Sequence, residues 1–204
     1  MLDDYKKHVD ERAELNIPPL PLDADQTSEL VSLLKEKNND PDYLLNLLKE
    51  RVPAGVDQAA YVKAAFLADI TTGNASSPYI SKIDAVEILG TMLGGYNVEP
   101  LIRCLEIEEL AETASHVLGR TLLIFDAFNE IFELSKKNKY AKKVIEEWAD
   151  AKWFTEKEDI KDQIKLTVFK VSGEINTDDL SPAPDAWSRP DTVSYTHLRA
   201  HETR

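Results

Sequence analysis

Apolar residues recur every three or four positions from residue 2 to about residue 154, and this spacing limits the fold more than any other feature of the chain. Such spacing is typical of amphipathic helices that bury one face. Prolines and glycine pairs interrupt it at short intervals, so each helix is expected to be short. The sequence therefore predicts a mostly α fold, built as a stack of short antiparallel helices.

Several helix ends are predicted from capping residues. Asp25 and Asp57 are expected to cap the helices that follow them, and Pro41 is expected to begin another. The run 81–84, Ser-Lys-Ile-Asp, resembles a capping box in front of an apolar stretch. Gly94 and Gly95 are expected to end that helix, because glycine accepts the left-handed conformation at helix ends.

Aromatic residues with helical spacing predict a buried face late in this region. The run from Thr121 to Lys136 is expected to form one helix whose phenylalanines lie in the core. These are Phe125, Phe128 and Phe132. Aromatic residues at this spacing are more often core residues than cofactor contacts.

The periodicity changes after residue 160. A charged linker at 155–163 precedes Ile164, Leu166 and Val168, which alternate with other residues as in a strand. We therefore expect a helical domain at residues 1–160 and the start of a second domain at 161–191. So few residues do not bury an independent core, and we expect the second domain to be cut short.

Composition excludes several classes of function. The net charge of −13 argues against binding nucleic acid over the whole surface. The single cysteine, Cys104, forms no intramolecular disulfide and is expected in a reducing, cytoplasmic setting. It also does not hold an iron–sulfur cluster by itself, because such clusters need several thiolates. No apolar run has the length of a membrane span, and no secretory signal is expected.

A polar, proline-rich loop after the predicted strand is the candidate site, since rigid loops at strand ends position side chains well. Its polar residues are Asn176, Thr177, Asp178, Asp179 and Ser181, and Trp187 and Arg189 follow. The two aspartates suit an acid/base pair, a cation site or ordinary turn caps. Ser181 has no evident histidine base. Arg189 suits a bidentate contact with a carboxylate ligand or an ordinary salt bridge.

Metal binding has little support in this chain. His197 and His201 are four residues apart, as in zinc-binding pairs on a helix, but no third ligand accompanies them. No metal site is predicted.

The run 176–191, Asn-Thr-Asp-Asp-Leu-Ser-Pro-Ala-Pro-Asp-Ala-Trp-Ser-Arg-Pro-Asp, resembles the start of the swivel domain of the aconitate hydratase B family, the bacterial-type aconitases. Its first four residues also resemble a loop of the isopropylmalate isomerase small subunit. Further upstream, the runs 1–9, 51–57, 60–64 and 89–97 are similar to the N-terminal HEAT-like helical domain of the same family. The resemblance covers residues 1 to about 191.

The resemblance implies a HEAT-like helical array followed by the start of an α/β swivel domain. It implies a hydro-lyase of the tricarboxylic acid cycle that interconverts citrate and isocitrate through cis-aconitate and also handles 2-methylisocitrate. The family uses a [4Fe–4S] cluster, one iron of which acts as a Lewis acid. Arg189 matches the family's substrate-binding arginine. The resemblance also implies that the other polar residues organise the loop; these are Asn176, Asp178, Asp179 and Ser181. It associates the helical domain with homodimer formation and substrate access.

The chain departs from the family pattern in length and at its end. Family members are several times longer, and their cluster cysteines and catalytic serine have no counterpart in residues 1–204. We therefore expect this chain to contain no catalytic residue, to bind no cluster and to be inactive alone. Residues 192–204 do not match the pattern, and we set them aside as a sequencing or assembly scar. The alternative function is a non-enzymatic helical module for dimerisation or protein binding. RNA binding, known among apo-aconitases, is opposed by the acidic charge.

Overall fold

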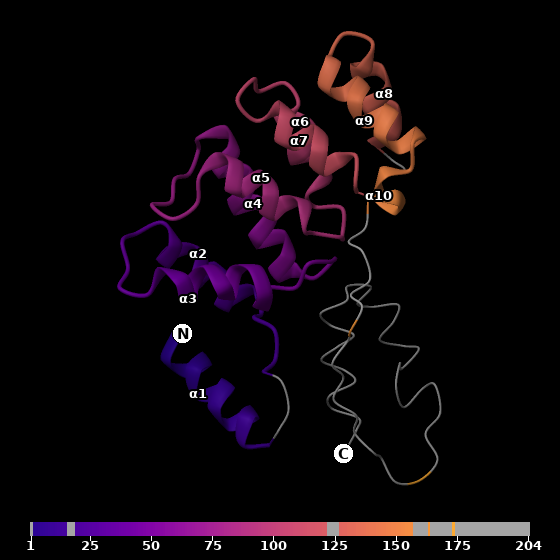
Figure 1. Ribbon diagram of the computed structural model, residues 1–204. Coiled ribbons are helices and arrows are strands. Elements are labelled where there is room, and N and C mark those ends of the chain that lie inside the picture. Colours follow the sequence, from indigo (N-terminus) through magenta and orange to yellow (C-terminus); the bar gives the residue numbers. More distant parts are fainter. Residues whose placement is uncertain (1, 16–18, 122–126, 157–162, 164–172, 174–204) are drawn as a thin grey trace.

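The computed structural model describes residues 2–15, 19–121 and 127–156, together with residues 163 and 173. Within these residues all regular secondary structure is helical (Figure 1). The mostly α fold predicted for this region is therefore confirmed. The strand predicted at 164–168 lies outside the described residues.

The helices are short and follow one another with brief connections. In chain order they are α1 (Leu2–Glu14), α2 (Ala24–Leu34), α3 (Pro41–Asn46), the π-helix η1 (Leu47–Arg51), α4 (Gln58–Thr72), α5 (Lys82–Gly90), α6 (Val98–Cys104), α7 (Ala111–Leu118), α8 (Phe128–Ser135), α9 (Lys139–Ala149) and α10 (Lys152–Thr155).

The helices stack in nearly the order of the sequence. α2 packs on α4, α4 on α5, α5 on α7, α7 on α9 and α9 on α8. Figure 1 shows the resulting array, with α2 and α3 near one end, α8 and α9 at the other, and α1 beside the first end. Each layer buries its apolar stripe against the next layer, so one continuous core runs through the array. Whether this arrangement is HEAT-like stays a prediction.

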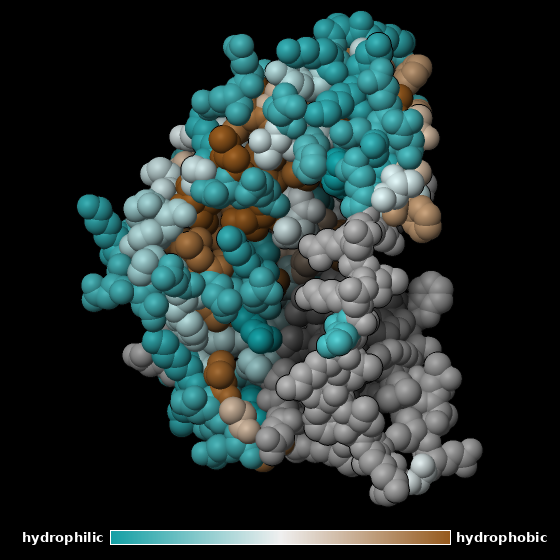
Figure 2. Space-filling model, viewed as in Figure 1, coloured by the Kyte–Doolittle hydropathy of each residue, from teal (hydrophilic) through white to brown (hydrophobic). Residues whose placement is uncertain are grey.

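Leucine and alanine dominate the core, and branched leucine side chains fill the spaces between the layers. Leu30, Leu67, Leu89, Leu101 and Leu118 each have 0% of their surface exposed. Figure 2 shows hydrophilic residues over much of the visible surface, with hydrophobic ones gathered in smaller groups between them. The separation of apolar and polar faces explains why helical spacing was the dominant signal in the sequence.

Capping explains where several helices begin. Asp57 caps α4, Pro41 is the first residue of α3, and the capping box at Ser81 is present at the start of α5. The predicted cap at Asp25 is wrong. Asp23 caps α2 instead, because its carboxylate accepts a hydrogen bond from the Gln26 amide at 2.8 Å while the Gln26 side chain accepts one from Asp23.

The predicted end of α5 at Gly94 and Gly95 is also wrong, since α5 ends at Gly90. The cause is a side chain rather than a glycine. Buried Asn97 donates hydrogen bonds to the carbonyl oxygens of Leu89 and Met92, at 2.9 and 3.0 Å. These bonds satisfy carbonyl groups at the helix end and turn the chain early.

The predicted burial of the phenylalanines is wrong where it is described. Phe128 and Phe132 are 44% and 45% exposed, and α8 begins at Phe128 rather than at Thr121. The buried face of α8 carries Ile131 and Leu134 instead. Phe125 lies outside the described residues. The aromatic residues of α8 therefore form an outer face, where Phe128 stacks on Phe132 with ring centroids 6.0 Å apart.

Candidate functional site

The site predicted from the sequence lies outside the described residues. This holds for Asn176, Asp178, Asp179, Ser181 and Arg189, and for the boundary at residue 160 and the tail at 192–204. Their roles therefore stay predictions. A different candidate site lies within the described helices.

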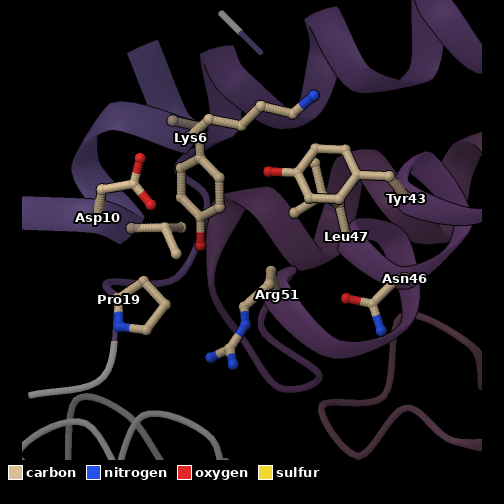
Figure 3. Close-up of a pocket in the computed structure, with 9 residues that line it drawn as sticks. Lys6, Asp10, Pro19, Tyr43, Asn46, Leu47 and Arg51 are labelled. Carbon is tan, nitrogen blue, oxygen red and sulfur yellow. The ribbon is translucent and has the colours of Figure 1, made fainter. Parts of the chain in front are cut away.

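This second site is a pocket of about 310 Å³ between α1 and the α3–η1 segment. A volume of this size is at the lower end of the range for small-molecule sites. Figure 3 shows Lys6 and Asp10 on the α1 side and Tyr43, Asn46 and Arg51 on the α3–η1 side. The described residues that line it are Tyr5, Lys6, Val9, Asp10, Pro19, Tyr43, Asn46, Leu47 and Arg51.

Tyr5 attaches α1 to the chain that follows it. It is 2% exposed, whereas every other described side chain of α1 has more contact with solvent. Its hydroxyl donates a hydrogen bond to the Leu20 carbonyl oxygen at 2.7 Å, and the Leu20 amide donates to His8 Nε2 at 3.0 Å. These two bonds hold α1 over the pocket while leaving most of its surface exposed.

Tyr43 places an unsatisfied hydroxyl group on the other side of the pocket. Its oxygen is buried and has no hydrogen-bond partner among the described residues. In Figure 3 this hydroxyl is directed from α3 toward α1. A buried hydroxyl without a partner is uncommon, because leaving it unsatisfied costs about 1–3 kcal/mol. The pocket therefore has a hydrogen-bonding position that the described residues do not fill.

Lys6 covers one face of the Tyr43 ring. Its Nζ atom lies 4.8 Å from the ring centroid and 3.9 Å from the Asp40 carboxylate. This cation–π geometry holds the ammonium group at the rim of the pocket. Because the Lys6 side chain is 49% exposed, the pair with Asp40 contributes little to stability.

Both tyrosine hydroxyls remain protonated near neutral pH. Burial raises the pKa of Tyr5 to about 12, and the charge of Arg51 opposes this shift. Burial also raises the pKa of Tyr43, with smaller contributions in the same direction from the Asp40 and Asp10 carboxylates. The Tyr5 hydroxyl uses its proton in the bond to Leu20, so the Tyr43 hydroxyl is the donor that a ligand would find.

The pocket suits binding rather than catalysis. The charged groups among its described lining residues are Lys6, Arg51 and Asp10, and none of these described residues is a cysteine, serine or histidine that would act as a nucleophile or base. The lining therefore carries two cations and one carboxylate, and the Asp40 carboxylate lies 3.9 Å from Lys6 Nζ. Its two cations give an anionic ligand groups to pair with, in a protein whose net charge is −13.

Metal binding has no support in the described part of the chain. No group of three or more His, Cys, Asp or Glu side chains is positioned there to hold an ion. Cys104 is buried in α6, and burial raises its pKa, so it is held as a neutral thiol near neutral pH. No helix among the described residues is long and apolar enough to cross a membrane.

Comparison with protein families gives two matches along the chain. The family described as "Aconitate B N-terminal domain" matches residues 4–154, and "Aconitate hydratase 2 N-terminus" matches residues 166–201. The first match contains the whole described array from Asp4 to Phe154. The second contains Arg189 and runs into the tail that the sequence analysis set aside.

Known relatives agree with these matches. Aconitate hydratase B of Pseudomonas aeruginosa strain PAO1 is 55% identical over 193 residues, which are 94% of this chain and 22% of that protein. Aconitate hydratase B of Escherichia coli strain K12 is 54% identical over the same shares of both chains. Aconitate hydratase B of Salmonella typhimurium strain LT2 is 54% identical over all of this chain and 24% of its own length.

The array is an all-helical N-terminal domain in the region that the structure describes, and the first family match spans almost all of it. The chain belongs to the aconitate B N-terminal domain family. The family resemblance drawn from the sequence is thus confirmed. The chain spans about a fifth of the length of the relatives named above.

Proposed function

We propose that this chain is the N-terminal part of an aconitate hydratase that interconverts citrate and isocitrate through cis-aconitate in the tricarboxylic acid cycle, and that the whole enzyme also dehydrates 2-methylisocitrate. The observation that carries this proposal is 55% identity to an aconitate hydratase B over 94% of the chain. Identity at this level over nearly all of the chain supports a common role for the region within the larger enzyme.

The chemistry of the reaction is expected to come from residues that this chain does not contain. In the proposed enzyme a [4Fe–4S] cluster supplies a Lewis acid for the substrate hydroxyl group. The residues of this chain do not fit such a cluster, because the chain has one cysteine and that thiol is buried in α6. We therefore propose that the 204-residue chain has no activity alone.

Arg189 is the residue of this chain that we propose contacts substrate. A guanidinium group donates two parallel hydrogen bonds to one carboxylate, and citrate and isocitrate each carry three carboxylates. Arg189 lies within the second family match, and its role there rests on the Trp-Ser-Arg-Pro-Asp motif at 187–191. We propose that the other polar residues hold the loop in its conformation and take no part in the reaction; these are Asn176, Asp178, Asp179 and Ser181.

A chimera tests the proposed function. Residues 1–191 of this chain replace the corresponding residues of E. coli aconitate hydratase B, and the purified chimera is assayed for formation of cis-aconitate from isocitrate after cluster reconstitution. We expect activity within an order of magnitude of the parent enzyme. A soluble chimera that retains its cluster and shows no turnover contradicts the proposal. In a parallel assay the 204-residue chain alone is expected to show none.

The alternative is a non-enzymatic helical module, and the proposed homodimer offers a way to examine it. Light scattering of the chain over a range of concentrations measures its oligomeric state directly. A dimer supports a scaffolding role for the helical domain, whereas a monomer at every concentration argues against it. A cytoplasmic location is proposed with the enzyme, since a single buried cysteine suits a reducing compartment.

A further inference from the structure

We propose that the pocket between α1 and the α3–η1 segment is a binding site for a small organic carboxylate, with the Tyr43 hydroxyl donating a hydrogen bond to a carboxylate oxygen and Lys6 and Arg51 supplying positive charge. The inference rests on the geometry of the described helices and does not depend on the proposed enzymatic function.

The first support is the Tyr43 hydroxyl itself. It is buried, it is directed into the pocket, and it has no partner among the described residues. A ligand that reaches this hydroxyl would give it an acceptor. A carboxylate oxygen is the stronger acceptor, because hydrogen bonds to a charged group are about twice as strong as those between neutral groups.

The second support is the local charge. Two cations, Lys6 and Arg51, line the pocket with one carboxylate, Asp10, and the Asp40 carboxylate beside Lys6 offsets part of this positive charge. Lys6 is held at the rim by the Tyr43 ring, 4.8 Å from the ring centroid. A group that is already positioned loses less side-chain entropy when a ligand binds.

The third support is shape. The remaining lining includes the Tyr5 side chain, Val9, Pro19 and Leu47, which together give an apolar wall. A volume of about 310 Å³ holds a small molecule with a flat or short apolar body. The favoured ligand is therefore a monocarboxylate with an apolar body rather than a bare inorganic anion.

The position of α1 gives the site a structural consequence. α1 is attached through Tyr5 and His8, and its other described side chains are largely outside the core. A ligand that contacts both Lys6 and Tyr43 bridges α1 to α3. Binding should therefore slow hydrogen exchange of the α1 amides, which a ligand adsorbed elsewhere on the surface would not do.

Benzoate titrated into the 204-residue chain tests the proposal, with benzamide as a neutral ligand of nearly the same shape. We expect saturable changes in the amide NMR signals of Tyr5, Lys6 and Tyr43, and binding of benzoate at least tenfold tighter than that of benzamide. Equal binding of the two ligands contradicts recognition of the carboxylate. Absence of a saturable change at these signals means that the pocket holds water only, and this overturns the proposal.

Matched variants locate the site. Tyr43→Phe removes only the unsatisfied hydroxyl, so it should fold normally and weaken benzoate binding about tenfold. Lys6→Met keeps the aliphatic stem and should weaken binding about fivefold to tenfold. Lys7→Met is the control, because it changes the net charge by the same amount as Lys6→Met. The Lys7 side chain is 78% exposed and is not among the lining residues of the pocket. An equal effect of Lys6→Met and Lys7→Met overturns the assignment.

Discussion

The backbone of Gly94 lies directly against the backbone of Gly55. A Cβ atom at Gly94 would overlap the carbonyl group of Gly55 and the amide of Val56. A hydrogen bond from the Leu93 amide to the Ala54 carbonyl oxygen, at 2.7 Å, joins the same two loops. These loops follow η1 and α5, and they carry most of the runs 51–57 and 89–97, which resemble the family. Their contact therefore connects two layers of the helical array.

Gly94→Ala should destabilise the fold by about 2–3 kcal/mol, because the clash is with backbone, which has no alternative rotamer. The neighbouring Gly95→Ala is the control. Gly95 has φ of +91° with open space around its Cα, so alanine there costs only the strain of a left-handed residue, about 1 kcal/mol. Urea unfolding measures both variants. Equal destabilisation by the two substitutions would show that the loops separate easily.

Asn138 connects α9 to the end of α6. Its Oδ1 atom accepts hydrogen bonds from the amides of Tyr140 and Ala141, at 2.8 and 3.2 Å. Its Nδ2 atom donates to the Leu105 carbonyl oxygen at 2.8 Å. One side chain thus caps a helix and ties it to an earlier layer.

Asn138→Ala should cost about 2 kcal/mol, because it removes a helix cap and a tertiary hydrogen bond together. Asn138→Asp keeps the oxygen that caps α9. It replaces the amide group that donates to the Leu105 carbonyl oxygen with a second oxygen, which does not donate. Thermal unfolding should therefore rank the wild type first. A melting temperature of Asn138→Asp equal to that of the wild type would mean that the bond to Leu105 contributes nothing.

Much of the helical array could be predicted from the sequence because its signals are local. A cap acts on residues two or three positions away, and apolar spacing reports directly on the buried face. This is why Asp57, Ser81 and Pro41 were identified correctly. Even the error at Asp25 was local: Gln26 stands three residues after Asp23, and that spacing is the capping-box pattern.

The failures share a different cause, which is tertiary structure. Nothing near Phe128 shows that the outer side of α8 faces away from the array. Nothing near Gly90 shows that Asn97 returns to bond with Leu89 and Met92. The pocket is the clearest case, since Lys6 and Tyr43 are brought together only when α1 folds beside α3. No sequence motif marks residues that become neighbours in this way.

Arg189→Lys in the proposed chimera should lower kcat/KM for isocitrate by tenfold or more. Lysine keeps the positive charge but replaces a planar fork of donors with a single ammonium group, so a bidentate contact is lost. Arg103→Lys is the control, since Arg103 lies on α6, is 56% exposed and pairs with Glu99 at the surface. Steady-state kinetics on chimeras with matched cluster content makes the comparison. An unchanged kcat/KM for Arg189→Lys contradicts the role proposed for Arg189.

Lys63 is a lysine buried in the core of the array. Its titration should make the free energy of unfolding rise with pH above about pH 8. It is 1% exposed, and burial lowers its pKa from 10.5 to about 8, against the opposing effect of the Glu50 carboxylate. Above pH 8 the folded protein has released this proton while the unfolded chain still binds it. Unfolding therefore takes up a proton between these two pKa values, and raising the pH in that interval favours the folded state.

Lys63→Met should consequently stabilise the protein at neutral pH by about 2–3 kcal/mol, because the folded state no longer has to keep a charged amine in its core. The gain should shrink as the pH rises from about 8 through 10.5, above which the wild-type amine is mostly neutral in both states. Tyr5 and Cys104 titrate in the alkaline range as well, so the difference between variant and wild type is the quantity to measure.

Lys82→Met is the control, since the Lys82 side chain is 44% exposed and pairs with Glu109 at the surface. Urea unfolding at a series of pH values gives the free energies. A difference between Lys63→Met and wild type that stays constant with pH would mean that the Lys63 amine reaches solvent in the folded protein.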